Sequence, residues 1–214
     1  MISFDRGEAL RYMGYHGAEP DAAVAESLER CAAELQAAVQ PKSISARFPL
    51  SFTGENTMQI GDLTITSANL ARNLRGCTEV YLMAATLGIG ADRLIARASA
   101  VRMSDAVILQ AVAAAMIETC CDEVNDALRR TAEREGLYCR PRFSPGYGDF
   151  SIEHQRDFSR LLDTPRKIGL TVTESCLLAP IKSVTAVIGL SPEKQDCHRK
   201  GCEECGKTDC NFRR

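Results

Sequence analysis

The longest regular pattern in the chain is SDAVILQAVAAAMIETCCDEVNDALRRTAEREG, residues 104 to 136. Ser104 is a typical N-cap residue and Gly136 a typical C-terminal stop, so the pattern predicts one helix that runs to about Glu135. One face of this helix carries small residues and then a carboxylate: Val107, Ala111, Ala115 and Glu118. Because small side chains let a neighbouring element approach closely, Glu118 is expected to be partly enclosed.

Shorter segments on both sides of this helix predict an α+β fold. Further helices are expected at 20–40, 67–76, 91–100 and 154–162, and strands at 44–52, 58–60, 63–65, 79–86, 170–174 and 183–190. Gly61-Asp62 suits the two-residue turn of a hairpin, and the last two strands could pair with each other. The pattern predicts a mixed or antiparallel sheet with the long helix across it.

Four of the ten cysteines lie near the C-terminus in the spacing C-x4-C-x2-C-x4-C: Cys197, Cys202, Cys205 and Cys210. The surrounding residues are polar and cannot build an apolar core, so a metal is the natural source of order. Tetrahedral zinc fits four thiolates, and the C-x4-C-x2-C spacing also occurs in plant-type ferredoxins, so zinc and an iron–sulfur cluster both stay open. We divide the chain into a domain over residues 1–190 and a cysteine-rich tail over residues 191–214.

The composition argues against several classes of protein. A formal net charge of -2, with acids and bases interspersed, is not that of a nucleic-acid binder or a polybasic membrane protein. No apolar run approaches the ~20 residues of a membrane span, and the N-terminus lacks the layout of a signal peptide. A cytoplasmic protein is expected, in which disulfides are disfavoured. The other six cysteines are then expected to be small buried hydrophobes: Cys31, Cys77, Cys120, Cys121, Cys139 and Cys176.

Residues 88–92, Gly-Ile-Gly-Ala-Asp, follow a predicted strand and precede a predicted helix. A dinucleotide-binding loop has this setting, but its third glycine would fall at position 93, which is Arg93. We therefore interpret the segment as an ordinary turn from strand to helix.

A second motif, RPRFSPGYG, spans residues 140–148. Ser144 to Tyr147 suits a type II turn, with proline second and glycine third, and such a turn can expose backbone N–H and C=O groups near Gly146. Arg142 offers a forked donor for a carboxylate, and Tyr147 offers a flat face and a hydroxyl. Together they could hold a small ligand with a carboxylate and a planar ring; the alternative is a surface turn with a solvated arginine.

This motif resembles a loop in the activation domain of cobalamin-dependent methionine synthase. Residues 142–147 are similar to the R-P-x-P-G-Y loop of that family, and residues 169–175, GLTVTES, are similar to its G-x-x-L-T-E-S strand. Residues 179–185 resemble the proline-bearing turn into the family's last strand. The resemblance covers about residues 85 to 192 and implies a stand-alone domain of this fold.

The resemblance implies binding of S-adenosylmethionine. It implies that Arg142 holds the methionine carboxylate, that backbone groups of Ser144 and Gly146 contact the ligand, and that Tyr147 lies beside it. Glu118 corresponds to a glutamate on the helix before the loop, where its charge would attract the cationic sulfonium. An aspartate that the family contributes from its N-terminal part has no counterpart that we can place.

The implied function is that of an accessory reactivation subunit of methionine synthase. The chain would be a methyltransferase component without catalytic residues of its own, presenting S-adenosylmethionine to the oxidised cobalamin of a partner during reductive remethylation. Its partners would be cobalamin-binding methionine synthase modules and an electron donor such as a flavodoxin or ferredoxin. The alternatives are an activator of another corrinoid methyltransferase system and a metal-stabilised binding module without a small-molecule ligand.

Overall fold

The computed structural model of the chain describes residues 3–15 and 19–194, and these residues form an α+β fold. The helices are α1 (Arg6–Tyr12), α2 (Ala22–Ala38), α3 (Ala68–Asn73), α4 (Ile89–Val101), α5 (Met103–Arg134), α6 (His154–Leu162) and α7 (Thr164–Ile168). The strands are β1 (Lys42–Phe52), β2 (Thr57–Ile60), β3 (Leu63–Thr66), β4 (Glu79–Thr86), β5 (Tyr138–Cys139), β6 (Thr171–Val172), β7 (Leu178–Ala179) and β8 (Ser183–Ser191).

Six of the strands form one antiparallel sheet in the order β3-β2-β1-β4-β8-β5. The predicted hairpin is present, since Ile60 pairs with Leu63 across a two-residue turn. The predicted pairing of residues 170–174 with 183–190 is wrong. Strand β6 pairs with β7 in a separate small sheet, while β8 lies between β4 and β5.

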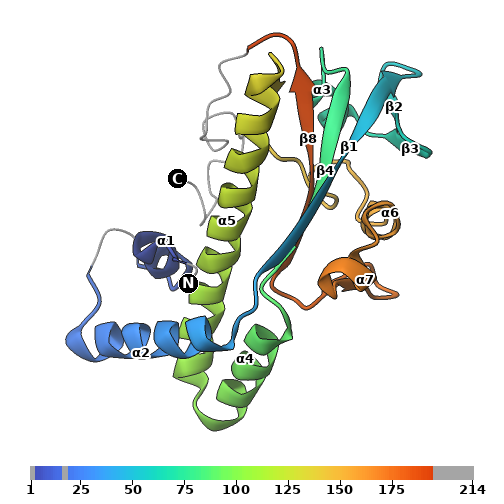
Figure 1. The fold of residues 1–214 in the computed structure, drawn as a ribbon. Helices are drawn as coiled ribbons and strands as arrows, with labels where there is room; N and C mark the ends of the chain where they lie inside the picture. The colour runs from blue at the N-terminus through green and yellow to red at the C-terminus, as the bar shows by residue number, and fades with distance from the viewer. Residues whose placement is uncertain (1–2, 16–18, 195–214) are drawn as a thin grey trace.

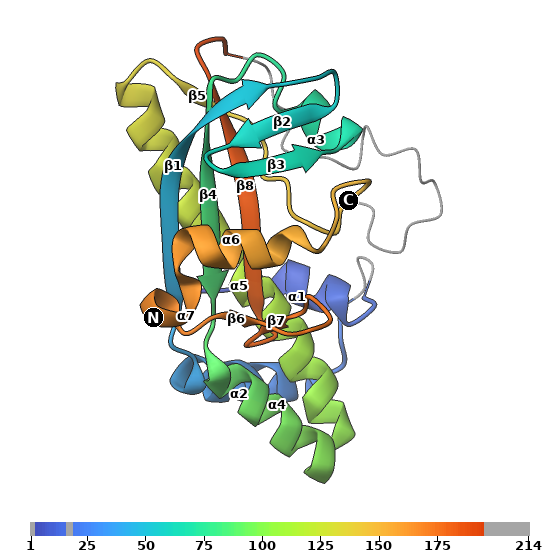
Figure 2. The ribbon, with the colours of Figure 1, turned by 90° about the vertical axis from the view of Figure 1, so that its right-hand side faces the viewer.

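The central strands are covered on both faces. On β4, Tyr81, Met83 and Ala85 belong to a core shared with α1, α2, α4 and α5. The alternate residues Val80, Leu82 and Ala84 belong to a second core shared with α6 and α7. Figures 1 and 2 show these two helical layers, with α5 on one side of the sheet and α6 crossing the other. Burial on both faces explains why residues 79–86 are almost continuously apolar.

Helix α5 is the predicted long helix, but it begins at Met103 with Arg102 as the N-cap, so the prediction of Ser104 as the cap is wrong. The chain reverses at Arg102, the single residue between α4 and α5, which leaves Ser104 inside the first turn. At the other end Gly136, with φ +75°, stops the helix as predicted.

By length and composition α5 could cross a membrane, which corrects the expectation that no apolar run is long enough. Among the helices that the structure describes, α5 alone is long and apolar enough for this, and 61% of its most apolar stretch is buried inside the fold. The apolar character of α5 is therefore accounted for by its packing on the sheet and on α1, α2 and α4.

Two further sequence predictions concern small residues. Five of the six scattered cysteines are buried, and Cys139 is half-buried, as expected for small hydrophobes. Residues 88–92 form the turn from β4 into α4, with Gly88 as the N-cap at φ +81°. Gly90 lies against the backbone of Ala38 at the end of α2, so the second glycine serves helix packing.

Candidate functional site

The segment before the Arg142 turn is held against the sheet. Arg140 N–H donates to the carbonyl of Gly189 at 2.8 Å, and Phe143 and Val187 exchange two backbone hydrogen bonds of 2.9 Å. The chain therefore follows the outer edge of β8 as far as Phe143. Arg142 lies within this anchored stretch, so its backbone position is fixed by the sheet.

The turn that follows has the predicted type II geometry. Tyr147 N–H donates to the carbonyl of Ser144 at 3.2 Å, and Gly146 has the positive φ (+95°) that the third position requires. The N–H of Gly146 donates to the carbonyl of Phe150 at 2.7 Å, so it is engaged inside the loop, contrary to the expectation that it is exposed. Gly146 is exposed, and its carbonyl oxygen is the backbone group of this residue that stays available to a ligand's amino group.

Asp149 fastens the loop to helix α3. Its carboxylate accepts hydrogen bonds from the Ser67 hydroxyl (2.6 Å) and from the backbone N–H groups of Ala68 (2.7 Å) and Asn69 (3.1 Å). These donors, the Ser67 hydroxyl first, lower the pKa of Asp149 to about 2. Gly148 has φ +56°, and a Cβ built there would lie 2.4 Å from the Asn69 side chain, so the loop and α3 are in close contact.

We expect Asp149→Asn to lower the melting temperature in a pH-dependent way. The folded pKa is below the unfolded value of about 3.9, so the stabilisation is fully present above about pH 4 and is lost as pH falls towards 2. Melting curves of wild type and Asp149→Asn should therefore differ at pH 7 and converge at low pH. Glu153→Gln in the same region is the control, and a difference that does not change with pH would contradict the assignment.

Arg142 lies between two carboxylates of α5. Its Nη1 is 2.8 Å from Asp122 Oδ1, and its Nη2 is 3.3 Å from Glu118 Oε2. The Arg142 side chain is 22% exposed, while those of Glu118 and Asp122 are 42% and 71% exposed. The expectation of an enclosed Glu118 is thus met only in part. Ala111 and Ala115 on the same stripe are buried, whereas Val107 is exposed, so the close approach is confirmed only in the middle of the stripe.

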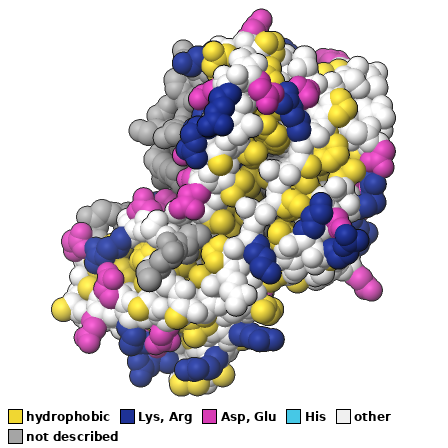
Figure 3. Space-filling view, in the orientation of Figure 1, with side chains coloured by type: hydrophobic (Ala, Val, Ile, Leu, Met, Phe, Trp, Pro, Cys, Tyr) yellow, Lys and Arg dark blue, Asp and Glu magenta, His cyan; other side chains and the backbone are white. Residues whose placement is uncertain are grey.

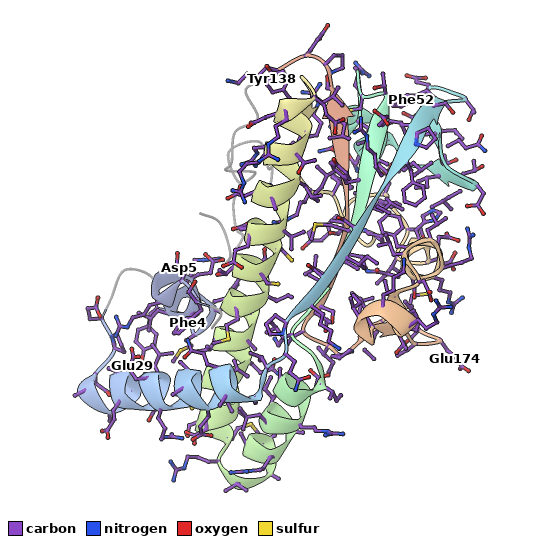
Figure 4. All side chains as sticks on the ribbon, viewed as in Figure 1. Phe4, Asp5, Glu29, Phe52, Tyr138 and Glu174 are labelled. Atoms are coloured by element: carbon purple, nitrogen blue, oxygen red, sulfur yellow. The ribbon has the colours of Figure 1, made fainter. Side chains whose placement is uncertain are left out.

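Helix α1 adds a polar face next to Glu118. Glu8 and Arg11 form an ion pair of 2.6 Å, and the Arg11 guanidinium lies 4.7 Å from the centre of the Tyr12 ring. Burial, then a hydrogen bond to Glu8, and then the charges of Glu8 and Glu118 raise the pKa of Tyr12 to about 12. Figure 4 shows α1, directly after the labelled Phe4 and Asp5, beside α5. This side of the site was not found from the sequence.

The structure brings together Arg142 and Glu118, and it places Ser144, Gly146 and Tyr147 in one turn beside them. Tyr147 is 67% exposed and projects from this surface. That these five residues bind a ligand stays a prediction. Asp122 was missed, although its position one helical turn after Glu118 is a usable signal. The helix that carries Glu8 could have been predicted from the pattern Asp5-x-x-Glu8, which is typical of a helix start. In the structure Asp5 is the N-cap of α1 and accepts a hydrogen bond from the Glu8 N–H.

The cysteines predicted to bind metal, Cys197, Cys202, Cys205 and Cys210, lie outside the described residues. Within residues 3–15 and 19–194, no group of three or more His, Cys, Asp or Glu side chains could hold a metal ion. The boundary that we predicted between the domain and the cysteine-rich tail, at residue 190, lies one residue before the end of β8 at Ser191.

No protein-family model matches the chain, and no curated protein matches it. Thirteen chains of solved structures do match. One is the crystal structure of the MetH reactivation domain bound to AdoHcy, at a TM-score of 0.66 and 16% sequence identity, with 90% of this chain and 75% of that chain covered. The motifs lie within residues 85 to 192, and the shared fold extends beyond that range, since 90% of this chain is covered. The chain has the fold of the methionine synthase reactivation domain, as its two motifs predicted.

Proposed function

We propose that the Arg142 site binds S-adenosylmethionine. The observation that carries this proposal is the placement of Arg142 between Glu118 and Asp122, beside a turn that is fixed at Phe143, Phe150 and Asp149. A guanidinium that already binds carboxylate oxygens is a suitable donor for the carboxylate of an amino acid. The Asp122 carboxylate, which is mostly exposed, stands in for the ligand carboxylate and would give way to it.

The other groups match the rest of the ligand. Glu118 provides negative charge for an ammonium or a sulfonium centre, at a place where α1 and α5 partly exclude water. The carbonyl oxygen of Gly146 can accept from an amino group, and the exposed ring of Tyr147 can stack on adenine. The similar domain was solved with AdoHcy, which supports a ligand of this chemistry here.

The biological role that we propose is reactivation of a cobalamin enzyme, with methionine synthase as the first candidate. Once an electron donor has reduced the cobalt of a corrinoid that a partner protein carries, the methyl group would pass to it from the sulfonium, and S-adenosylhomocysteine would be released. This chain needs no nucleophile or general base for that transfer, because it only binds the sulfonium and orients its methyl group. The exposed position of Tyr147 and Asp122 leaves the site open to a partner.

Isothermal titration calorimetry with three ligands tests the binding step. S-adenosylmethionine and S-adenosylhomocysteine should bind, because both carry the amino-acid end that Arg142 recognises. 5′-Methylthioadenosine lacks that end and should bind about 10- to 150-fold more weakly, the value of a charge-assisted carboxylate contact. Equal binding of all three, or binding of none, would contradict the proposal.

Two further experiments address the partner and the tail. Capture of cobalamin-binding methionine synthase modules would support the proposed role, whereas capture of a different corrinoid protein would assign the chain to that system. Flavodoxin and ferredoxin are the electron donors to test with the captured complex.

Metal analysis of anaerobically purified protein decides between zinc and an iron–sulfur cluster at Cys197, Cys202, Cys205 and Cys210; a metal-free tail would contradict both.

A further inference from the structure

Strand β1 has a neighbouring strand along most of its length on one side and only at its end on the other. Its first eight residues, Lys42 to Pro49, pair with β4, whereas β2 pairs only with Leu50 to Phe52. The outer edge from Lys42 to Pro49 thus has no strand beside it in the part of the chain that the structure describes. Figure 1 shows this part of β1 at the front of the sheet, and Figure 2 shows it as the outermost strand.

The hydrogen bonds further along β1 show which groups face this edge. Leu50 N–H donates to the carbonyl of Thr78 on the β4 side, and Thr53 N–H donates to the carbonyl of Thr57 on the β2 side. Successive residues of an antiparallel strand bond to opposite neighbours, so the odd-numbered residues of β1 face outward. The groups on the open edge are the N–H and C=O of Ser43, Ser45 and Arg47 and the C=O of Pro49.

A cleft of about 500 Å³ runs beside the start of this edge, on the side of α5. Ser43 lines it from β1, and Cys120, Glu123 and Val124 line it from α5. Glu123 is exposed. Figure 3, which faces the edge, shows a stripe of hydrophobic side chains along the middle of the surface, with charged side chains on both sides. The edge thus combines backbone donors and acceptors with a place for a side chain.

We propose that this edge pairs with the same edge of a second copy of the chain. An antiparallel pair with its two-fold axis at Ser45 sets Ser45 opposite the partner's Ser45, and Ser43 opposite the partner's Arg47. All three outward N–H groups of each copy then find a carbonyl, which gives six hydrogen bonds. The two sheets join into one, and the interface is self-complementary as a two-fold axis requires. This pairing does not depend on ligand binding at Arg142.

The apolar face of β1 favours a second copy over an unrelated strand. Opposite residues of a pair share a face, so the partner's Arg47 lies beside Ser43, while its guanidinium keeps the ion pairs with Glu79 and Glu135 of its own copy. On the other face Ile44, Ala46 and Phe48 are half-buried. The pairing sets Ile44 opposite the partner's Ala46, so that the two apolar rows become continuous.

The edge also has a defined end. Pro49 has no N–H to offer, and the turn of the β2–β3 hairpin lies against Phe48, since a Cβ built at Gly61 is 3.3 Å from the Phe48 ring. A strand that pairs with β1 cannot extend past this point. Proline at an edge limits open-ended strand addition, so the edge admits one short partner strand in a restricted register.

Sedimentation velocity of the full chain over a range of concentrations tests the pairing. The wild type should form a dimer. Ser45→Pro removes two of the six hydrogen bonds and should raise the dimer dissociation constant about 30-fold, since each bond is worth about 1 kcal/mol. Proline is tolerated at this outward-facing position, as it is at Pro49, and the melting temperature checks that the fold is kept. Ser45→Thr retains the N–H and should dimerise as the wild type does.

Cross-linking tests the register. After oxidation, the Ser45→Cys variant should form a disulfide between the substituted position of one copy and the same position of the other. Mass spectrometry of a digest detects this disulfide as two identical peptides joined together. Ser43→Cys, which lies opposite the partner's Arg47, should not cross-link to itself. A monomer at all concentrations would overturn the proposal, even if the edge bound an extended peptide of another protein. A dimer that Ser45→Pro leaves unchanged would overturn it as well, because another surface would then hold the copies together.

Discussion

Replacing Arg142 by alanine is expected to weaken S-adenosylmethionine binding about 10- to 150-fold, and the protein should stay folded. A charge-assisted bond to a carboxylate is worth about 1.5–3 kcal/mol, and the forked guanidinium makes it specific for that group. In the free protein Arg142 pairs with two carboxylates that are 42% and 71% exposed, and water can solvate both after the substitution. The fold should therefore change little, because exposed ion pairs contribute at most about 1 kcal/mol. Calorimetry and a melting curve of the same sample separate binding from stability.

Two further substitutions control this result. Arg142→Lys keeps the charge but loses the fork, so its affinity should lie between those of the wild type and the alanine variant. Arg166→Ala removes an arginine that is 86% exposed and ion-paired with Asp163 on the far layer, so it should bind as the wild type does. Full affinity in Arg142→Ala would remove Arg142 from the site.

Asp122 provides a sharper check of the same idea. If the ligand carboxylate takes the place of Asp122 on the guanidinium, Asp122→Asn removes a competitor and should bind equally well or a few-fold more tightly. If Asp122 instead contacts the ligand ammonium, the same variant should bind more weakly. The direction of the change in affinity therefore shows which end of the ligand lies at Asp122.

The main elements of the fold could be predicted from the sequence because they carry local signals. Helix α5 has a long periodic pattern, and its end at Gly136 follows from a glycine that can adopt positive φ. The partner of β6 could not be predicted, because a strand of two residues has no face pattern that selects one neighbour over another. The start of α5 was misplaced because the chain reverses between α4 and α5 within the single residue Arg102. This short connection fixes where α5 begins, and it overrides the N-cap preference of Ser104.

The candidate site was predictable on one side only. The turn geometry followed from Pro145 and Gly146, whose conformational preferences are local. The contact between Arg142 and Glu118 joins residues 24 apart in the chain, and it was expected only through the resemblance to a known loop. Helix α1 has seven residues, too few to show a clear period, so its approach to Glu118 was not foreseen. Short helices are positioned by tertiary packing, here on α5.

The largest loss of stability is expected from Gly90→Ala. A Cβ built at Gly90 would lie 2.0 Å from the carbonyl oxygen of Ala38 and 2.9 Å from its carbonyl carbon. Both atoms are backbone at the end of α2, so no side chain can turn away, and α4 must move from α2 and from its place on α5. Alanine is intrinsically better than glycine in a helix by about 1 kcal/mol. Overpacking typically costs about 1–3 kcal/mol and occasionally more, and against this rigid backbone we expect a cost of about 3–4 kcal/mol.

The clash therefore outweighs the helix preference, and we expect a net loss of about 2–3 kcal/mol. For a chain of this size that lowers the melting temperature by roughly 4–12 °C. Gly54→Ala is the matched control, because its Cβ would meet Thr57 at an ordinary 3.6 Å, and its effect should stay within about 0.5 kcal/mol. An alanine at position 90 that is neutral or stabilising would mean that α2 and α4 do not pack as closely as described, and that Gly90 has another role in the turn.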